Sequence, residues 1–185
     1  MAPELLQGLY GIRPAVAARW ARPLQDAADL ADCASGARLC AFLAQIGHES
    51  GRLRYTREIW GPTDQQLRYE PATTLSKRLG NVDPGDGSRY RGRGLIQTTG
   101  RANYALTTVK LRELVASVPD FEADPAQLEA DRWAALSAGL FWRVKGLNRC
   151  ADAGNFAELT RRINGGFNGL ADRQALYTRA LILVH

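Results

Sequence analysis

The sequence predicts a mainly α-helical protein. Apolar residues recur at helical spacing before residue 50 and after residue 101. Between these stretches, from residue 52 to residue 100, the helical periodicity fades and glycine, proline and aspartate accumulate, as they do in loops and turns. The chain has 185 residues, of which 45% are hydrophobic and 23% charged, as in an ordinary globular domain. We therefore expect one domain over residues 1–185, with N-terminal helices over 1–37 and a core over 38–185.

The first helical stretch contains several breaking residues. We expect its breaks at Gly11, Pro14, Pro23 and Gly36. Pro23 falls inside an apolar run at helical spacing (Val16, Trp20 and Leu24), and we expect it to break or kink that run because proline lacks the backbone N–H.

The clearest helix follows Ser35-Gly36. One apolar face is formed there by Leu39, Phe42, Leu43 and Ile46. Gly47 and Gly51 favour an end near His48-Glu49-Ser50.

The region from Arg52 to about Gly100 is predicted to be an ordered, glycine-rich loop region, with room for a short hairpin. Helical sequence resumes at 102–118 and again at 132–147, where one face carries Trp133, Leu136, Leu140, Phe141 and Val144. A short helix is expected from about 155 to 163, ended by Asn164-Gly165-Gly166, and a last amphipathic helix over 172–184.

Composition excludes several classes of protein. The longest aliphatic run, 181–184, is far shorter than the roughly 20 residues that a membrane helix needs, and residues 1–9 do not resemble a secretory signal. The net charge of +5 favours anionic surroundings without choosing among them. The three cysteines are predicted to be buried structural thiols. We expect no metal site, since there are only two histidines and no CxxC pair.

Glu49 is the first candidate for chemistry. It follows Ile46 by three residues and Phe42 by seven, so it extends the apolar stripe of its helix. Partial desolvation there, and the negative end of the helix dipole, would raise its pKa, as a general acid requires. The alternative interpretation is a solvated residue at a fraying helix end.

A glycosidic reaction needs a second carboxylate, and Glu58 is the nearest one downstream. Its alternative interpretation is an exposed partner for Arg54 or Arg57. Spacing alone leaves four rival carboxylates open: Asp64, Glu70, Asp83 and Asp86.

The tract Arg89-Tyr90-Arg91-Gly92-Arg93-Gly94 admits an RNA-binding interpretation, because arginine and tyrosine stack on bases and follow phosphates. The apolar pair Leu95-Ile96 follows at once, which favours an ordered element and argues against nucleic acid as a partner. The sequence contains no P-loop, no complete EF-hand loop and no GxSxG motif.

Three blocks in this chain resemble the signature blocks of glycoside hydrolase family 19. They are Ala44-Gln45-Ile46-Gly47-His48-Glu49-Ser50-Gly51, Tyr90-Arg91-Gly92-Arg93-Gly94-Leu95-Ile96-Gln97 and Ile163-Asn164-Gly165-Gly166. The resemblance extends from about Ala41 to Arg173 and is greatest to the phage endolysins of the family. It implies a single catalytic domain with a lysozyme-like helical fold, whose glycine-rich loops line a substrate cleft.

The resemblance also implies roles for particular residues. Glu49 would be the general acid and Glu58 the base in an inverting cleavage of a β-1,4 bond, for which the two carboxyl groups stand roughly 6.5–9.5 Å apart. Thr99 stands where chitinases often carry a serine that helps to hold the water. The substrate-binding set would be His48, Tyr90, Gln97, Asn103, Asn164 and Arg173.

Two departures from the plant chitinase pattern affect the predicted substrate. Ala102 replaces a common aromatic residue and Thr99 replaces serine, so peptidoglycan glycan strands are the expected substrate and chitin oligomers the alternative. The family implies no cofactor, a monomer with no stable membrane insertion, synthesis in the host cytoplasm, and action on the cell wall from the periplasm after release through a holin.

Overall fold

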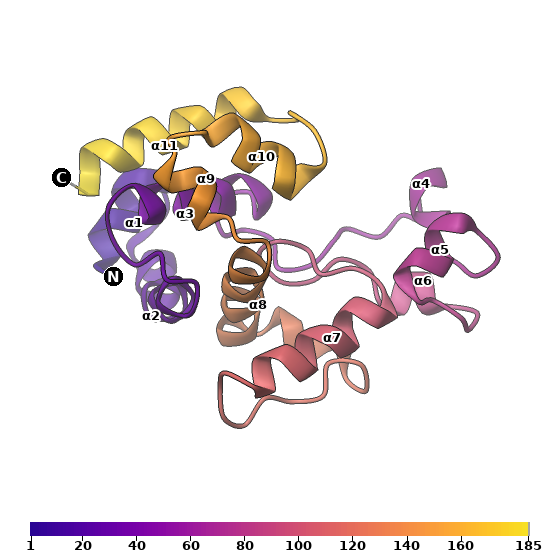
Figure 1. The fold of residues 1–185 in the computed structure, drawn as a ribbon. Coiled ribbons are helices and arrows are strands. Elements are labelled where there is room, and N and C mark those ends of the chain that lie inside the picture. The colour runs from indigo at the N-terminus through magenta and orange to yellow at the C-terminus, as the bar shows by residue number, and fades with distance from the viewer. Residues whose placement is uncertain (185) are drawn as a thin grey trace. The chain divides into compact units, whose positions relative to one another are not determined.

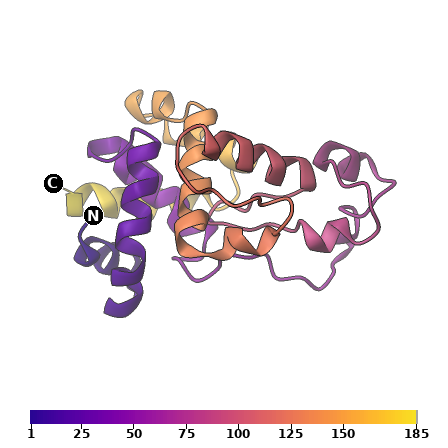
Figure 2. The ribbon, with the colours of Figure 1, turned by 90° about the horizontal axis from the view of Figure 1, so that it is seen from below.

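The computed structural model describes residues 1–184, which form helices joined by turns and loops (Figures 1 and 2). Over these residues there is no strand, and the predicted mainly helical fold is confirmed. The helices are α1 (Pro3–Tyr10), α2 (Pro14–Leu30), α3 (Gly36–Glu49), α4 (Asp64–Leu67), α5 (Thr74–Leu79), α6 (Asp86–Arg89), α7 (Arg101–Arg112), the 3₁₀ helix η1 (Pro125–Glu129), α8 (Asp131–Val144), α9 (Asn148–Asp152), α10 (Phe156–Asn164) and α11 (Leu170–Val184).

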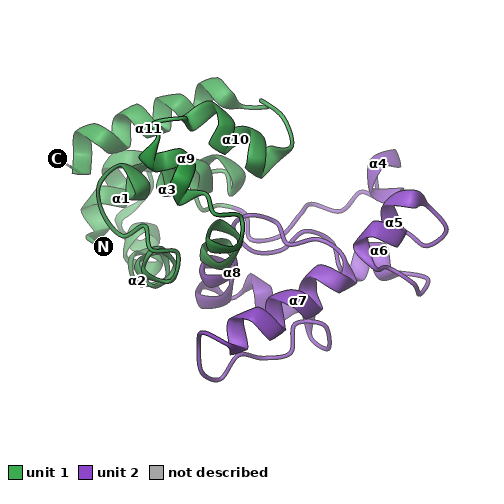
Figure 3. Ribbon diagram, in the orientation of Figure 1, with its two compact units in different colours: residues 1–54, 138–185 green, residues 55–137 purple. Residues whose placement is uncertain are grey.

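The chain divides into two compact units (Figure 3). Unit 1 comprises Met1–Arg54 together with the described residues from Ala138 onward, and unit 2 comprises Tyr55–Ser137. Helix α8 contributes residues to both units. The assignment of 1–185 to one domain stays a prediction.

Unit 1 is organised around α3, which packs against α9 and α11, while α1 packs against α2 and α11. The predicted apolar face of α3 is confirmed, since its four members are at most 6% exposed. Helix α3 ends at Glu49, as its flanking glycines predict. Gly139 of α8 lies so close to the backbone carbonyl of Ala27 that a Cβ at that position would overlap it.

The prediction at Pro23 was wrong in one respect, because α2 runs through this residue without a break. The buried face of the helix continues beyond Pro23 with Leu24, Ala27 and Ala28, so tertiary packing outweighs the missing hydrogen bond. The predicted face of α8 is also shorter than expected, since Val144 at its end is 63% exposed.

Unit 2 contains short helices joined by loops rather than a hairpin. Its β-type pairing within the described residues consists of isolated bridges from Arg93 to Arg57 and to Thr98. Helices α4 and α5 each begin with a capping box, in which the side chains of Thr63 and Gln66, and of Thr73 and Ser76, satisfy backbone N–H groups. Helix α7 ends at Arg112, earlier than its sequence predicts.

Within the described chain, no helix is both long enough and apolar enough to cross a membrane.

Candidate active site

Glu49 is the last residue of α3, and its side chain is 20% exposed. Its Oε1 accepts a hydrogen bond of 2.5 Å from Nη2 of Arg173 on α11, whose side chain is 2% exposed. In the part of the chain that the structure describes, Oε2 of Glu49 has no such partner. Arg173 thus anchors one oxygen of the Glu49 carboxyl group and leaves the other oxygen able to contact a ligand.

A buried polar chain continues inward from this ion pair. Nη1 of Arg173 donates to Oε1 of Gln45, and Nε2 of Gln45 donates over 2.8 Å to Oγ1 of Thr160 on α10. Gln45 and Thr160 are both 0% exposed. These bonds fix α3, α10 and α11 to one another beneath Glu49. Each buried polar group gains a protein hydrogen-bond partner in place of the water that it loses on burial. Sequence reasoning missed Gln45, although a glutamine within an apolar helical run is a signal of such a network.

His48 lies beside Glu49 and is held by the start of α11. Nδ1 of His48 is 2.7 Å from Oδ2 of Asp172, and Nη2 of Arg52 donates over 2.5 Å to Oδ1. Burial pushes the pKa of Asp172 upward, but the hydrogen bonds from His48 and Arg52 outweigh it and hold the pKa below its usual value. Gly169 packs so closely on the His48 ring that any Cβ there would collide with it.

Asn164 ends α10 and offers an unused donor. Its Nδ2 is buried without a hydrogen-bond partner among residues 1–184, and the next residue, Gly165, adopts the left-handed conformation that closes the helix. Such an orphaned amide in a native protein calls for a partner that the chain does not supply.

Glu58 is held within unit 2 through both of its carboxylate oxygens. Nε2 of Gln66 donates to Oε1 over 2.9 Å, and the backbone N–H of Gly92 donates to Oε2 over 3.0 Å. The backbone N–H of Glu58 in turn donates over 2.8 Å to the carbonyl of Gly92. An ionised carboxylate, which only accepts hydrogen bonds, matches this pair of donors.

Gln66 is 5% exposed and fully engaged: its second Nε2 hydrogen reaches the carbonyl of Ile59, and its Oε1 accepts from the N–H groups of Gly61 and Thr63. Sequence reasoning missed Gln66 as well. The Thr-x-x-Gln pattern that begins α4 is the signal that marks it.

Gly92 also brings Gln97 and Thr99 toward Glu58. A Cβ on Gly92 would collide with Oε1 of Gln97 and would lie 3.2 Å from Oγ1 of Thr99. The Thr99 hydroxyl donates over 3.0 Å to the carbonyl of Gln97, and Nδ2 of the exposed Asn103 donates over 2.7 Å to the carbonyl of Thr99. Gln97 has a φ of 58°, a strained conformation for a side-chain-bearing residue.

Two members of the predicted substrate-binding set are buried. Tyr90 is 1% exposed and its hydroxyl donates over 3.0 Å to the carbonyl of Glu122, a contact that supports the loop. Arg173 is 1% exposed, and its guanidinium donates to Gln45 and Glu49.

The structure thus places the predicted site residues in two groups, one in each unit. Unit 1 holds His48, Glu49, Asn164 and Arg173, and unit 2 holds Glu58, Tyr90, Gln97, Thr99 and Asn103. Their assigned catalytic and binding roles stay predictions.

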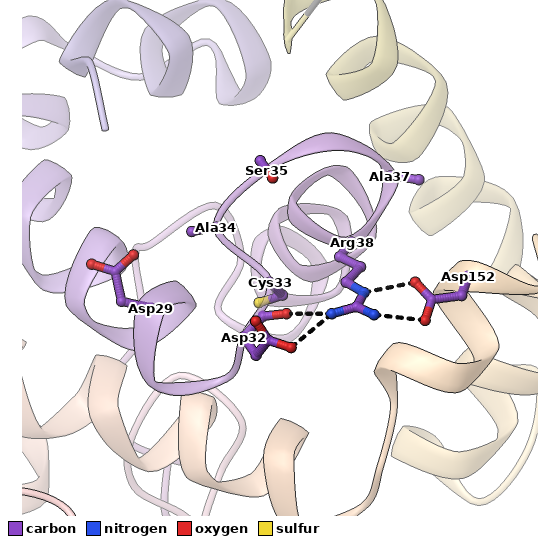
Figure 4. A pocket seen from close by; sticks show the side chains of 8 residues that line it. All are labelled: Asp29, Asp32, Cys33, Ala34, Ser35, Ala37, Arg38 and Asp152. Atoms are coloured by element: carbon purple, nitrogen blue, oxygen red, sulfur yellow. Dashed lines mark hydrogen bonds and ion pairs between the residues drawn. The ribbon is translucent and has the colours of Figure 1, made fainter.

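A pocket elsewhere in unit 1 contains none of these residues (Figure 4). Arg38 spans it, with Nε 2.6 Å from Oδ1 of Asp152 and Nη1 2.8 Å from Oδ2 of Asp32. The residues that line it are Asp29, Asp32, Cys33, Ala34, Ser35, Ala37, Arg38 and Asp152. These ion pairs join the α2–α3 connection to α9, which is a structural role.

The three cysteines are buried free thiols, as predicted. Burial raises the pKa of Cys33 to about 12 and also raises the pKa of Cys40. Across residues 1–184, no three side chains of the types that bind metals are grouped as a metal site would require.

Comparison with known proteins places these features in context. The chain is 35% identical over 176 residues to a glycosyl hydrolase family 19 domain-containing protein of Haemophilus influenzae, an alignment that covers 83% of this chain and 82% of that protein. No protein-family model matches the chain.

Two solved structures share the fold. Chitinase C from Streptomyces griseus superposes with a TM-score of 0.71 at 23% identity, over 99% of this chain and 76% of that one. A bacterial family 19 chitinase superposes with a TM-score of 0.66 at 21% identity, over 99% of this chain and 94% of that one.

Proposed function

The chain belongs to glycoside hydrolase family 19 and is a glycoside hydrolase, and from this premise we propose that it cleaves β-1,4 bonds in the glycan strands of bacterial peptidoglycan, as a phage endolysin. The observation that carries the proposal is Glu49, a partly exposed carboxyl group at a helix end with one oxygen anchored by the buried Arg173.

We assign Glu49 as the general acid that protonates the leaving oxygen of the glycosidic bond through its unanchored Oε2. Glu58 is the base that activates water on the opposite face of the sugar. The two donors to Glu58, from Gln66 and Gly92, fix the orientation of its carboxylate and support this assignment. Thr99 and Gln97 lie around Gly92 and support a role in holding the water or the sugar.

Peptidoglycan is preferred to chitin because of two positions in unit 2. Ala102 is exposed at the beginning of α7, where the plant chitinase pattern commonly has an aromatic residue, and Thr99 replaces a serine of that pattern. Both replacements fall at positions tied to sugar subsites, so they favour a different sugar from that of chitin.

Purified peptidoglycan sacculi provide the direct test. The wild-type protein should solubilise them, and Glu49→Gln should not. The substitution keeps an oxygen that accepts from Arg173 and replaces the other carboxyl oxygen by an amide nitrogen, which cannot protonate the leaving oxygen; a thermal unfolding curve checks that the variant is folded. Solubilisation that persists in Glu49→Gln at the wild-type rate would refute the assignment of the acid. Mass spectrometry of borohydride-reduced products identifies which sugar gains the new reducing end.

Chitin hydrolysis is the second candidate, favoured by the chitinase fold of the two solved structures. Hydrolysis of chitin hexamers well above hydrolysis of sacculi, at matched concentrations of reducing-end equivalents, would favour this substrate over peptidoglycan.

A further inference from the structure

We propose that Arg91, in cation–π contact with Trp60, is a specificity-determining residue that binds a carboxylate of the glycan strand near Glu58. This inference rests on the proposed function and deepens it, because it names the chemical group that separates peptidoglycan from chitin. Every contact that supports it lies within unit 2.

The chain connects both members of the pair directly to the Glu58 site. Trp60 follows Glu58 by two residues, and Arg91 precedes Gly92, whose N–H donates to Oε2 of Glu58. The guanidinium carbon of Arg91 lies 5.7 Å from the centroid of the Trp60 ring, within the range of a cation–π contact.

The Trp60 ring is itself fixed from a second side. Its centroid is 6.2 Å from that of Tyr69, with the two rings tilted by 39°. Because Nε of Arg91 is buried, an incoming carboxylate is bound by the two Nη groups, whose paired N–H donors match a carboxylate in geometry.

The local charges leave Arg91 without a carboxylate of its own. Glu129 is taken by two other arginines, with Nε of Arg93 at 2.7 Å from its Oε1 and Nη1 of Arg57 at 3.4 Å from its Oε2. Among the residues that the structure describes, Arg91 forms no ion pair, and its buried Nε has no hydrogen-bond partner.

Burial lowers the pKa of Arg91, and the neighbouring Arg93 and Arg57 lower it further. An arginine without an ion pair, in a partly desolvated position beside other cations, gains most from an incoming anion.

The two candidate substrates differ in this one respect. Chitin is built from neutral N-acetylglucosamine, whereas peptidoglycan carries carboxylates. They come from the lactyl group of N-acetylmuramic acid where the peptide has been removed, and from the stem peptide where it is present. A carboxylate on either source satisfies Arg91, and a chitin strand offers none.

Binding measured in the Glu49→Gln background tests the inference without relying on hydrolysis. Isothermal titration calorimetry compares three probes: chitotetraose, the alternating N-acetylglucosamine–N-acetylmuramic acid tetrasaccharide without peptide, and the same tetrasaccharide with stem peptides. Arg91→Gln should weaken binding of a carboxylate-bearing probe about tenfold, as expected for one lost charge-assisted contact, and should change chitotetraose binding less than twofold. Arg91→Lys should restore part of the loss.

Arg78→Gln is the matched control, because Arg78 is an exposed cation of the same unit and its removal changes the net charge equally. Loss with the peptide-free probe identifies the lactyl carboxylate as the ligand, and loss confined to the peptide-bearing probe identifies the stem peptide.

Three results would overturn the inference: equal weakening of all three probes by Arg91→Gln, no weakening of any, or equal affinity of the parent protein for acidic and neutral probes. Failure of the proposed function is a separate result. A wild-type protein that leaves sacculi intact, while Arg91 still discriminates among the probes, refutes peptidoglycan hydrolysis alone.

Discussion

The ion pair between Glu49 and Arg173 predicts a loss of both stability and activity when Arg173 is replaced. Arg173→Met removes three contacts of the guanidinium, with Glu49 at 2.5 Å, with the carbonyl of Asn168 at 3.3 Å and with Gln45. Glu49 is 20% exposed and can turn to water, but Gln45 is 0% exposed and cannot. Leaving a buried polar group unsatisfied costs about 1–3 kcal/mol, and breaking a buried ion pair about 3–5 kcal/mol.

We therefore expect Arg173→Met to lower the free energy of unfolding by about 3 kcal/mol, the value at which those two ranges meet. For a chain of this size, this corresponds to a fall of roughly 6–12 °C in the unfolding midpoint. Because Glu49 also loses its anchor, kcat on sacculi should fall while KM changes little. Urea unfolding followed by circular dichroism measures the first effect, and initial rates measure the second.

The control is Arg179→Met, which removes an exposed arginine from the same helix and should change the unfolding free energy by no more than about 0.5 kcal/mol. A Gln45→Leu/Arg173→Met double mutant should lose less unfolding free energy than the sum of the two single mutants. Each single substitution leaves the other residue without its hydrogen-bond partner, whereas the double mutant removes both residues. Strict additivity, or an Arg173→Met protein as stable as Arg179→Met, would refute the account of the buried chain.

Three further predictions concern packing, thiols and acid. Gly139→Ala should destabilise by about 1–3 kcal/mol in thermal unfolding, because the added Cβ meets the backbone carbonyl of Ala27, whereas Gly8→Ala, which meets only the flexible end of a side chain, should be neutral or stabilising. The thiol of Cys33 is 1% exposed, and burial raises its pKa to about 12. It should not react with a disulfide reagent at about pH 8, near the unperturbed thiol pKa, until the protein is unfolded. Rapid reaction of the native protein would contradict this burial. Burial favours the protonated form of Asp86, but hydrogen bonds from Arg101 and from backbone N–H groups outweigh it and hold the pKa of Asp86 below normal. The stability that this group contributes is therefore present above about pH 4 and is lost as the pH falls further. Asp86→Asn should flatten that part of the acid-unfolding curve, and an unchanged slope would contradict the prediction.

Much of the helical framework follows from apolar periodicity. The stripe on α3, the end of that helix at Glu49 and the helix after Asn155 were predicted, because local spacing alone determines which face is apolar and where glycine stops it. The continuous α2 was not, since the packing that carries it through Pro23 depends on residues distant in sequence.

The sequence predicts individual residues of the candidate site but not the long-range contacts that hold them. Glu49 and Glu58 emerge from spacing and from resemblance to a family. The resemblance also names Arg173, but its bonds to Glu49 and Gln45 follow from no periodicity, because these residues are 124 and 128 positions away in the sequence. Gln66, eight residues from Glu58, was within reach of local reasoning through the capping pattern that it completes.

The buried hydrogen-bond chain from Glu49 to Thr160 has a practical consequence for engineering. The short His-Glu-Ser segment cannot be transplanted to another scaffold as a motif, because what orients its acid is contributed by α10 and α11 as well as α3. A successful graft would have to carry all three helices, and a directed-evolution library should hold Gln45, Thr160 and Arg173 constant while the loops around Glu58 are varied.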